Sequence, residues 1–409
     1  MTEAGATLRG RTAGLRSGAR RPRLRLLLAI SAVVVVAVAA VAAAATGHPP
    51  ASPELRIRGA DISFTLQEEA INQLLTDNGT QAPVERILSD HGANFVRLRL
   101  WVNPQPGTSD LGSALTLARR AHDAGLQLLL DLHYSDSWAD GTAQHPPAAW
   151  QGFSKHELVS TVESYTRETV AAFGRQGTPV DIVQIGNEIT RGMLWPYGQI
   201  YRPDGEDWAG ISELVNAGAR GARNATPDHQ PLIMIHSDTG GDRDASINFF
   251  DQLQRQGVGF DMIGLTYYPF WNGSLADLDR TLRALAYRYN KDIIVAETAY
   301  PWTLSSSGGV RSVVRSAEAL PDAAEYPPTP QGQANFYAAL NRLLREVPDG
   351  RGAGYFIWEP GWLPGVGADA HTGNAHSNLT LFDWQGHGLP ALDAFRPTGT
   401  SGSARAAGG

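Results

Sequence analysis

Between residues 55 and 396, eight short apolar runs alternate with longer segments whose apolar residues recur at helical spacing. The strand-like runs span residues 57–62, 94–102, 127–133, 181–187, 231–236, 260–267, 292–297 and 352–358. The helix-like segments include residues 111–124, 156–173, 208–223, 275–289 and 331–346. Strands that alternate with helices build a parallel sheet with helical crossovers. Eight such units predict an α/β fold in which the sheet closes into a (β/α)8 TIM barrel.

The main alternative is an open, doubly wound sheet. That fold usually carries a Gly-rich phosphate-binding loop after its first strand. In this chain Asp61, Ile62 and Ser63 stand at that place instead. The chain length of 409 residues also fits a barrel behind a leader, since barrels take ~250 residues or more as one domain. We therefore predict a single barrel domain over residues 55–396.

Residues 1–46 have the features of an export signal. An Arg-rich stretch from Arg9 to Arg25 precedes the run 26–45, which is apolar except for Ser31, and small residues follow. This pattern predicts either a cleaved signal peptide or a retained N-terminal membrane anchor, because the run is also long enough to cross a bilayer. Both place the domain outside the cytoplasm, secreted or attached to the cell membrane. Residues 47–54 are predicted to be a linker and residues 397–409 a disordered tail.

Polar or aromatic side chains stand at the end of every strand-like run. In chain order they are Asp61; Arg97, Arg99 and Trp101; Asp131 and His133; Asn187 and Glu188; His236 and Asp238; Tyr267 and Tyr268; Glu297; and Trp358 and Glu359. In a (β/α)8 barrel the C-terminal ends of the strands form the active face. The pattern therefore predicts a site lined from all sides of the barrel.

Two of these side chains, Glu188 and Glu297, end the fourth and the seventh runs. Side chains at these places converge across the mouth of a closed barrel. Hydrolysis of a glycosidic bond needs one carboxyl group that donates a proton and another that attacks the anomeric carbon. In retaining enzymes the two lie about 5–5.5 Å apart, and like charge at that distance raises the pKa of one of them. We predict that Glu188 and Glu297 are such a pair.

Neighbouring residues are suited to position this pair or its substrate. Asn187 precedes Glu188, and its amide can bind a sugar hydroxyl. Tyr267 and Tyr268 end the sixth run, where a phenol can hydrogen-bond the carboxylate of the seventh. Adjacent strand residues face opposite ways, so one of the two tyrosines is expected in the core.

Two arginines share one face of the second strand. Arg97 and Arg99 are two residues apart, and either can pair with Glu297 and lower its pKa. The chain also has 10 Trp and 12 Tyr residues, which fit a carbohydrate cleft but equally fill a core.

At these residues the chain resembles glycoside hydrolase family 53, the arabinogalactan endo-β-1,4-galactanases. The matching segments are RGADIS (58–63), NFVRLRLWVNP (94–104), LLDLHYSDSWAD (129–140), VQIGNEITRGMLWP (183–196), GLTYYPFW (264–271), VAETAYPWT (295–303), QGQANF (331–336) and GYFIWEPGWLP (354–364). They span nearly all of the predicted domain in barrel order. The resemblance implies a retaining barrel hydrolase that cuts β-1,4-galactan, the side chain of type I arabinogalactan in pectin.

The resemblance also implies roles for individual residues. Glu188 matches the acid/base of the family and Glu297 its nucleophile, and Trp358 would lie under the sugar next to the cleaved bond. The residues expected to bind substrate are Arg97, Arg99, His133, Asp136, Trp138, Asn187, Tyr267, Tyr268, Trp302, Trp358 and Trp362. Arg191 departs from the family, where Asn is usual, and stands near the acid/base.

No cofactor is expected. Some family members bind calcium in a loop after the seventh strand, but residues 304–314 of this chain are rich in Ser and Gly and hold no acidic side chain. Calcium needs several carboxylate or carbonyl oxygens. The loop after Trp358 carries Asp369, His371, Asn374, His376 and Asn378. We interpret it as a polar loop facing the substrate, in preference to a metal site.

Composition narrows the partners. The net charge of −7 argues against nucleic acid, whose recognition needs a basic patch. The chain has no cysteine, which excludes disulfides and Cys-ligated metals. We expect a monomer that acts on a polysaccharide and contacts a membrane only through an N-terminal anchor.

Three alternatives are compatible with the same residues. The scaffold and its acid pair would serve equally on mannan, xylan or glucan, because acid and nucleophile do not read the hydroxyl pattern of the sugar. A non-catalytic surface sugar-binding protein would need the aromatic residues but not both Glu188 and Glu297. A metallohydrolase would use His133 and His236, yet no spacing such as H-E-x-x-H is present.

Overall fold

The computed structural model describes residues 54–366 and 374–397. All eight strand-like runs form strands, which pair in parallel and close into one barrel. The barrel strands are β1 (Ile57–Asp61), β4 (Phe95–Leu100), β5 (Gln127–Leu132), β6 (Ile182–Ile185), β11 (Leu232–Ser237), β12 (Met262–Thr266), β13 (Asp292–Thr298) and β14 (Gly352–Ile357). Strands that follow one another in the chain are neighbours in the sheet, and β14 pairs with β1. The predicted (β/α)8 fold is confirmed, and the doubly wound alternative is excluded.

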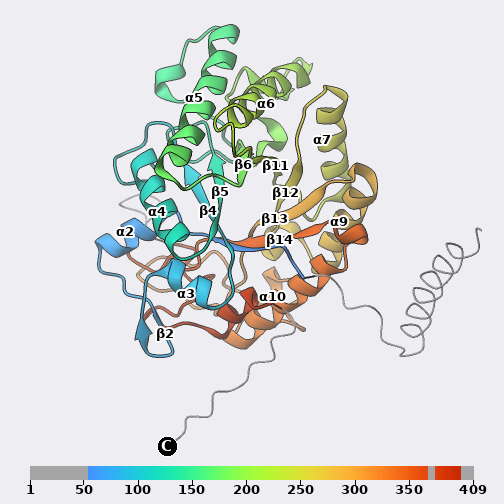
Figure 1. Ribbon diagram of the computed structural model, residues 1–409. Coiled ribbons are helices and arrows are strands. Elements are labelled where there is room, and N and C mark those ends of the chain that lie inside the picture. Colours follow the sequence, from blue (N-terminus) through green and yellow to red (C-terminus); the bar gives the residue numbers. More distant parts are fainter. Residues whose placement is uncertain (1–53, 367–373, 398–409) are drawn as a thin grey trace, which may run out of the picture. The chain divides into compact units, whose positions relative to one another are not determined.

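Helices surround the barrel, and Figure 1 shows them in a ring around the strands. They are α2 (Thr65–Ala70), α3 (Val84–Asp90), α4 (Leu111–Asp123), α5 (Lys155–Gln176), α6 (Trp208–Arg223), α7 (Arg243–Arg255), α8 (Pro269–Asn272), α9 (Leu275–Tyr289) and α10 (Pro330–Arg345). The five helices predicted from the sequence correspond to α4, α5, α6, α9 and α10. The predicted bounds of α6 and α9 agree with the structure at both ends.

Local sequence determines where the helices begin and end. Ser154 and Ser274 each form a capping box with the acidic residue three positions later, Glu157 and Asp277. These side chains accept hydrogen bonds from N–H groups that have no partner within the helix. Helix α5 ends at Gly177, whose φ of 81° is left-handed and suits glycine.

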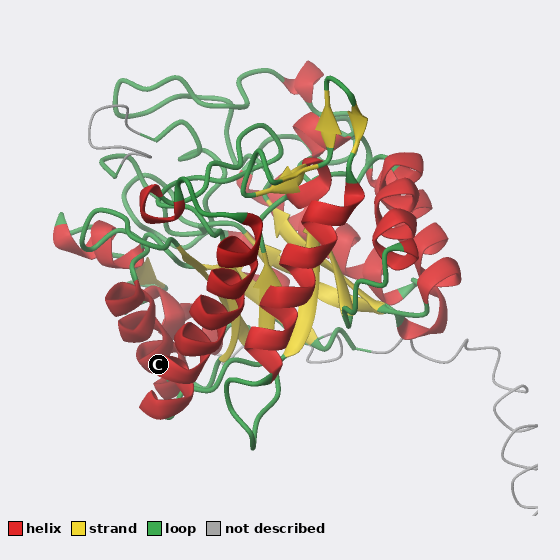
Figure 2. Ribbon diagram, turned by 90° about the horizontal axis from the view of Figure 1, so that it is seen from above, coloured by secondary structure: helices red, strands yellow, loops and turns green. Residues whose placement is uncertain are grey.

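The inside of the barrel changes from apolar to polar along its axis. A buried apolar cluster fills the N-terminal part, made of Ile57, Phe95, Leu129, Ile182, Met234, Met262, Ile294, Ala296, Ala353 and Phe356. Two residues after members of this cluster come the buried polar side chains of Arg97, Asp131, Gln184 and His236. Because strand residues alternate in direction, these side chains also face the interior. Longer loops gather at one end of the barrel, as Figure 2 shows.

Three short two-stranded sheets and several 3₁₀ turns lie outside the barrel sheet. The pairs are β2 (Thr76–Asp77) with β3 (Thr80–Gln81), β7 (Gly192–Met193) with β8 (Gly198–Gln199), and β9 (Tyr201–Arg202) with β10 (Gly205–Glu206). The 3₁₀ turns are η1 (Ala148–Trp150), η2 (Ile189–Arg191), η3 (Ala317–Ala319), η4 (Pro348–Gly350) and η5 (Pro390–Phe395). The first pair follows α2 and returns the chain to α3.

Several predictions fall outside the described residues. They concern the leader (1–46), all but the last residue of the linker (47–54), all but the first residue of the tail (397–409), and Asp369 and His371. Over residues 54–366 and 374–397, no helix is both long and apolar enough to cross a membrane.

Candidate active site

Glu188 stands just after β6, at a sharp change of chain direction. Its own backbone has a φ of +49°, and η2 begins at the next residue. A positive φ is uncommon outside glycine, and such strained positions cluster at functional sites. The turn brings the carboxyl group of Glu188 to the mouth of the barrel.

Glu297 lies within β13, where the pairing with β12 is irregular. Leu265 pairs with Val295, but Thr266 pairs with Glu297, so the register shifts by one residue. Ala296 belongs to the apolar cluster inside the barrel, and strict alternation would therefore turn Glu297 outward. An irregularity of this kind re-aims side chains, and it directs Glu297 into the mouth of the barrel.

The two carboxyl groups line one pocket of about 210 Å³. Its other lining residues are Arg97, Arg99, His133, Trp138, Ala139, Asp140, Asn187, Tyr268, Trp271, Trp358, Trp362 and His376. Burial raises the pKa of Glu188, and the negative charge of Glu297 raises it further, so the two groups interact. The structure thus brings together side chains that lie more than a hundred positions apart in the sequence.

Arg97 is the central charge beneath the pocket. Its Nη1 donates to Asp61 at 2.9 Å, and its Nη2 donates to Asp131 at 2.8 Å and lies 2.8 Å from Glu297 Oε1. The side chain is 1% exposed, and a buried charge needs such partners. Of the two arginines that were candidates to pair with Glu297, Arg97 is the one that does so.

Arg99 has different partners. Its guanidinium lies 4.3 Å from the ring centroid of Trp138 and 4.7 Å from that of Phe64. Its Nη1 is 3.4 Å from Glu359 Oε1. Burial raises the pKa of Glu359 well above its ordinary value. Stacking of a cation on aromatic faces is attractive, so Arg99 holds Trp138 in place as a wall of the pocket.

The two carboxyl groups of the pocket have unlike surroundings. Burial raises the pKa of Glu188 to about 8, and the charge of Glu297 adds to the shift. Burial also raises the pKa of Glu297, but the Arg97 charge opposes that shift. The Tyr268 hydroxyl donates to Glu297 Oε2 at 3.0 Å and opposes it as well. A proton shared by the pair therefore favours Glu188, and Glu297 is left ionised.

A buried chain of hydrogen bonds runs inward from Glu188. Thr266 Oγ1 lies 2.6 Å from Glu188 Oε1 and 2.9 Å from His236 Nε2. His236 Nδ1 lies 2.9 Å from Asn187 Oδ1. Burial lowers the pKa of His236 well below its ordinary value, so the ring is neutral. These hydrogen bonds fix the position of the Glu188 carboxyl group and connect it to Asn187, the preceding residue.

His133 is held in one orientation by the same layer. Its Nδ1 accepts a hydrogen bond from Ala139 N at 3.3 Å, and its Nε2 therefore carries the proton that it donates to Asp131 at 2.9 Å. The ring thus lines the pocket with a defined face.

The structure distinguishes between the two adjacent tyrosines. Tyr268 faces the pocket, whereas Tyr267 points to the outer core and donates its hydroxyl to Gly273 O at 2.9 Å. The expectation that Tyr267 binds substrate is corrected, because Thr266 takes the inward position on β12 and its neighbour must turn outward.

Two predicted residues on loops also do not line this pocket. Asp136 accepts hydrogen bonds from Asn103 N at 3.0 Å and Ala148 N at 2.8 Å, so its carboxylate joins two loops. Trp302 donates to Thr380 Oγ1 at 3.3 Å, and its ring packs against Trp384. Both side chains anchor loops, and neither lines the pocket that contains Glu188 and Glu297.

Several residues of the site were not assigned to it from the sequence. Trp271 on α8 lines the pocket and is 61% exposed, and Asp140 lines it as well. His376, which also lines it, belongs to the loop that was predicted to face the substrate. Trp271 ends the motif GLTYYPFW, which was a usable signal. Thr266 gave none, because a single Thr at a strand end is ordinary.

The polar loop after Trp358 braces the site. Asn374 donates to Trp362 O, and Asn378 donates to Thr303 O and Val314 O at 2.8 Å each. His376 stacks on Trp362 with ring centroids 5.4 Å apart. Within the described ranges, no group of three or more His, Cys, Asp or Glu side chains is arranged to hold a metal ion.

The chain is similar to known proteins in sequence and in fold. Residues 57–395 match the model of glycosyl hydrolase family 53. The fold superimposes on the GH53 catalytic domain of Ignisphaera aggregans with a TM-score of 0.78 and 35% identity, over 86% of this chain and 97% of that one. An arabinogalactan endo-beta-1,4-galactanase of Humicola insolens is 34% identical over 353 residues, which is 83% of this chain and 99% of that protein. A protein of Niallia circulans from the bgaB 5′ region is 39% identical over 349 residues, 84% of this chain and 94% of that protein. The chain therefore belongs to glycosyl hydrolase family 53.

Proposed function

We propose that the protein is a retaining endo-β-1,4-galactanase in which Glu188 is the general acid/base and Glu297 is the nucleophile. The observation that supports the proposal is the shared pocket. In this pocket the surroundings of Glu188 favour its protonated form, and the surroundings of Glu297 favour its ionised form. Family membership and a relative named arabinogalactan endo-beta-1,4-galactanase support galactan as the substrate.

In the first step, the Glu297 carboxylate attacks the anomeric carbon while Glu188 gives its proton to the departing sugar oxygen. The glycosidic bond breaks, a glycosyl ester forms on Glu297, and the shortened chain leaves. In the second step, Glu188 takes a proton from a water molecule that attacks the ester, and the product leaves in its original β configuration. Arg97 and Tyr268 hold Glu297 ionised and oriented before the attack.

The walls of the pocket suit a sugar ring. Trp138, Trp358 and Trp362 contribute aromatic surface, and their rings contact one another. Flat aromatic faces pack against apolar C–H faces, while indole N–H groups and neighbouring amides bind hydroxyls. His376 and Trp271 extend this aromatic lining toward the exposed rim.

The substrate assignment is tested by release of reducing ends from four polysaccharides. We expect release from linear β-1,4-galactan and none above background from β-mannan, xylan or β-glucan. Proton NMR of the first products should show the β anomer before mutarotation. Release from xylan or mannan without release from galactan would transfer the assignment to another glycan.

The pH dependence of kcat/KM should be bell-shaped, with its alkaline limb near pH 8. Glu188 must hold a proton for the first step, so activity is present below its pKa of about 8 and is lost as the pH rises through it. Glu297 must be ionised, so activity is lost as the pH falls through its pKa, which burial raises above the ordinary glutamate value. The measurement is kcat/KM for a soluble galacto-oligosaccharide across this range.

Thr266→Val provides the control for this profile. The Thr266 hydroxyl lowers the pKa of Glu188, and valine removes that hydroxyl at similar volume. The alkaline limb should then move to higher pH while the acid limb stays. An alkaline limb that is unmoved in this variant would assign it to a group other than Glu188.

A further inference from the structure

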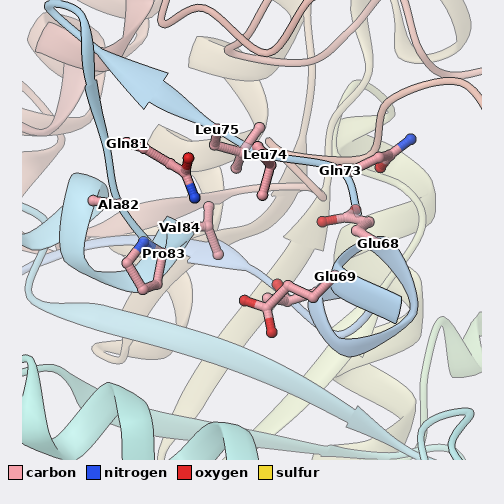
Figure 3. A pocket seen from close by; sticks show the side chains of 10 residues that line it. Glu68, Glu69, Gln73, Leu74, Leu75, Gln81, Ala82, Pro83 and Val84 are labelled. Carbon is pink, nitrogen blue, oxygen red and sulfur yellow. The ribbon is translucent and has the colours of Figure 1, made fainter. Parts of the chain in front are cut away.

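A second pocket lies beside α2, and it shares no lining residue with the active-site pocket. Its volume is about 260 Å³, compared with about 210 Å³ at Glu188 and Glu297. Its walls come from α2, from the segment that leads to β2, and from the chain between β3 and the start of α3, as Figure 3 shows. Nothing in the proposed reaction uses this pocket.

Glu68 is the buried polar group of this second pocket. The residue is 4% exposed, and Figure 3 shows its carboxyl group turned toward the space between Leu74 and Val84. Its Oε1 has no hydrogen-bond partner among the described residues. Burial raises the pKa of Glu68 to about 8, and the charge of Glu69 adds to this shift. The group is therefore neutral near pH 7 and can donate one hydrogen bond and accept another.

Gln73 supplies a second buried group of this kind. Its Nε2 donates to Pro364 O at 2.5 Å, which leaves its Oε1 as an acceptor. That oxygen is buried and, within the described part of the chain, has no partner. Buried polar atoms are nearly always hydrogen-bonded, and two orphans lining one pocket indicate a ligand that brings hydroxyl or N–H groups.

The surroundings of these two groups favour a neutral ligand over a cation. Both carboxylate oxygens of Glu69 are already bound by Arg120, at 2.6 and 2.7 Å. Glu68 is neutral, so the pocket offers no free carboxylate to a cation. Leu75 and Val84 give it an apolar wall. A sugar ring combines hydroxyl groups with apolar C–H faces and matches this lining.

We propose that this second pocket binds a single sugar unit of the polysaccharide, with hydroxyls paired to Glu68 and Gln73 and a ring face against Leu75 and Val84. The inference rests on the proposed carbohydrate substrate. The sugar unit comes either from the galactan backbone or from an arabinose branch, since both present the same hydroxyl chemistry.

The second pocket is backed by the loop that also serves the active site. Trp358 and Trp362 of this loop line the active-site pocket. Between them, Gly361 backs Glu68 so closely that a Cβ atom there would lie 3.2 Å from Glu68 Oε2. Pro364 of the same loop accepts the hydrogen bond from Gln73. A polysaccharide held at Glu68 therefore stays beside the loop that carries the aromatic wall of the active site.

The test is affinity electrophoresis of the full chain in gels that contain a polysaccharide, with Glu297→Ala in every sample to prevent cleavage. Glu68→Leu and, separately, Gln73→Leu should weaken retardation about fivefold to tenfold, the effect of losing roughly one hydrogen bond. Glu68→Gln keeps a neutral hydrogen-bond donor and acceptor at this position and should be retarded as much as the parent chain. Gels with linear galactan and with arabinose-substituted galactan identify which sugar occupies the pocket, and a xylan gel reports specificity.

A second readout separates binding from a structural role. With Glu297 restored, kcat/KM for a short β-1,4-galacto-oligosaccharide should be the same in Glu68→Leu as in the parent chain. Equal loss on the oligosaccharide and in the gels, or unchanged retardation in both leucine variants, would overturn the proposal. Stabilisation by calcium or methylammonium that Glu68→Leu abolishes, without any effect on retardation, would also overturn it. If the parent chain fails to cleave galactan, that result counts against the proposed function and not against the second pocket. Retardation is then measured in gels that contain whichever polysaccharide the chain binds.

Discussion

Replacement of Glu297 by alanine is expected to abolish galactan hydrolysis, lowering kcat by roughly 10⁴-fold or more, while the polysaccharide still binds. In the proposed mechanism the variant lacks the oxygen that attacks the anomeric carbon, and no other carboxylate that lines the pocket is paired to both Arg97 and Tyr268. Arg97 keeps Asp61 and Asp131 as partners, so its buried charge remains compensated and the fold should survive. The measurements are reducing-end release and retardation in a galactan gel.

Azide provides a sharper readout for the same variant. It fits the space left by the carboxylate and attacks the anomeric carbon of an aryl β-galactobioside from the face that Glu297 used. The expected product is the α-glycosyl azide. Glu85→Ala is the matched control, because Glu85 is also buried and paired with an arginine, Arg120, but lies on α3. It should lower stability and leave turnover intact. Substantial hydrolysis by Glu297→Ala would remove this residue from the proposed role.

The barrel could be predicted because its cause is repeated eight times along the chain. Each strand is apolar and short, most are followed by a segment with helical periodicity, and eight such units favour a closed parallel sheet over an open one. The predicted positions of the strand ends were less accurate than the number and order of the strands. The predicted runs included His133, Asn187 and Tyr267, which lie one or two residues beyond the strands. At His133 and Tyr267 one backbone hydrogen bond to the neighbouring strand continues beyond the strand end, to Leu100 O at 3.2 Å and to Glu297 O at 2.9 Å. At Asn187 the chain has already turned, because Gly186 before it has a φ of 77°.

Strand positions predicted the site better than loop positions did. Residues on the strands have their distance from the barrel axis set by the sheet, which is why Arg97 and Glu297 line one pocket. Glu188 lies three residues beyond β6 and reaches the same pocket through the turn that follows that strand. Residues on loops have no such constraint: Trp138 and Trp362 line the pocket, whereas Asp136 and Trp302 anchor loops.

The direction of individual side chains depends on features that the sequence does not display. Alternation shows that Tyr267 and Tyr268 face opposite ways but not which of them faces inward. The register shift between β12 and β13 decides that Glu297 faces the pocket, and its cause lies in how two strands pair and not in either segment alone. The partner of Glu188 is likewise a long-range one, since Thr266 is 78 positions away.

Replacement of Glu188 by alanine is expected to affect the two steps differently, which makes it the complement of the Glu297 variant. On galactan the loss of kcat/KM should be about 10²–10⁴-fold, because in the proposed mechanism Glu188 gives the proton that the departing sugar oxygen needs. On an aryl β-galactobioside with an acidic phenol the first step needs no proton and should remain fast. The second step lacks its base, so the glycosyl ester on Glu297 should accumulate and appear as a burst of phenol.

Azide again identifies the role of the missing group. In Glu188→Ala it replaces water in the second step and attacks from the face opposite Glu297, so the product should be the β-glycosyl azide. The two alanine variants therefore predict azides of opposite anomeric configuration from one substrate. The α product from Glu188→Ala, or the β product from Glu297→Ala, would exchange the two assignments. This comparison is informative because both side chains line the same pocket, and only their partners, Thr266 on one side and Arg97 with Tyr268 on the other, tell them apart.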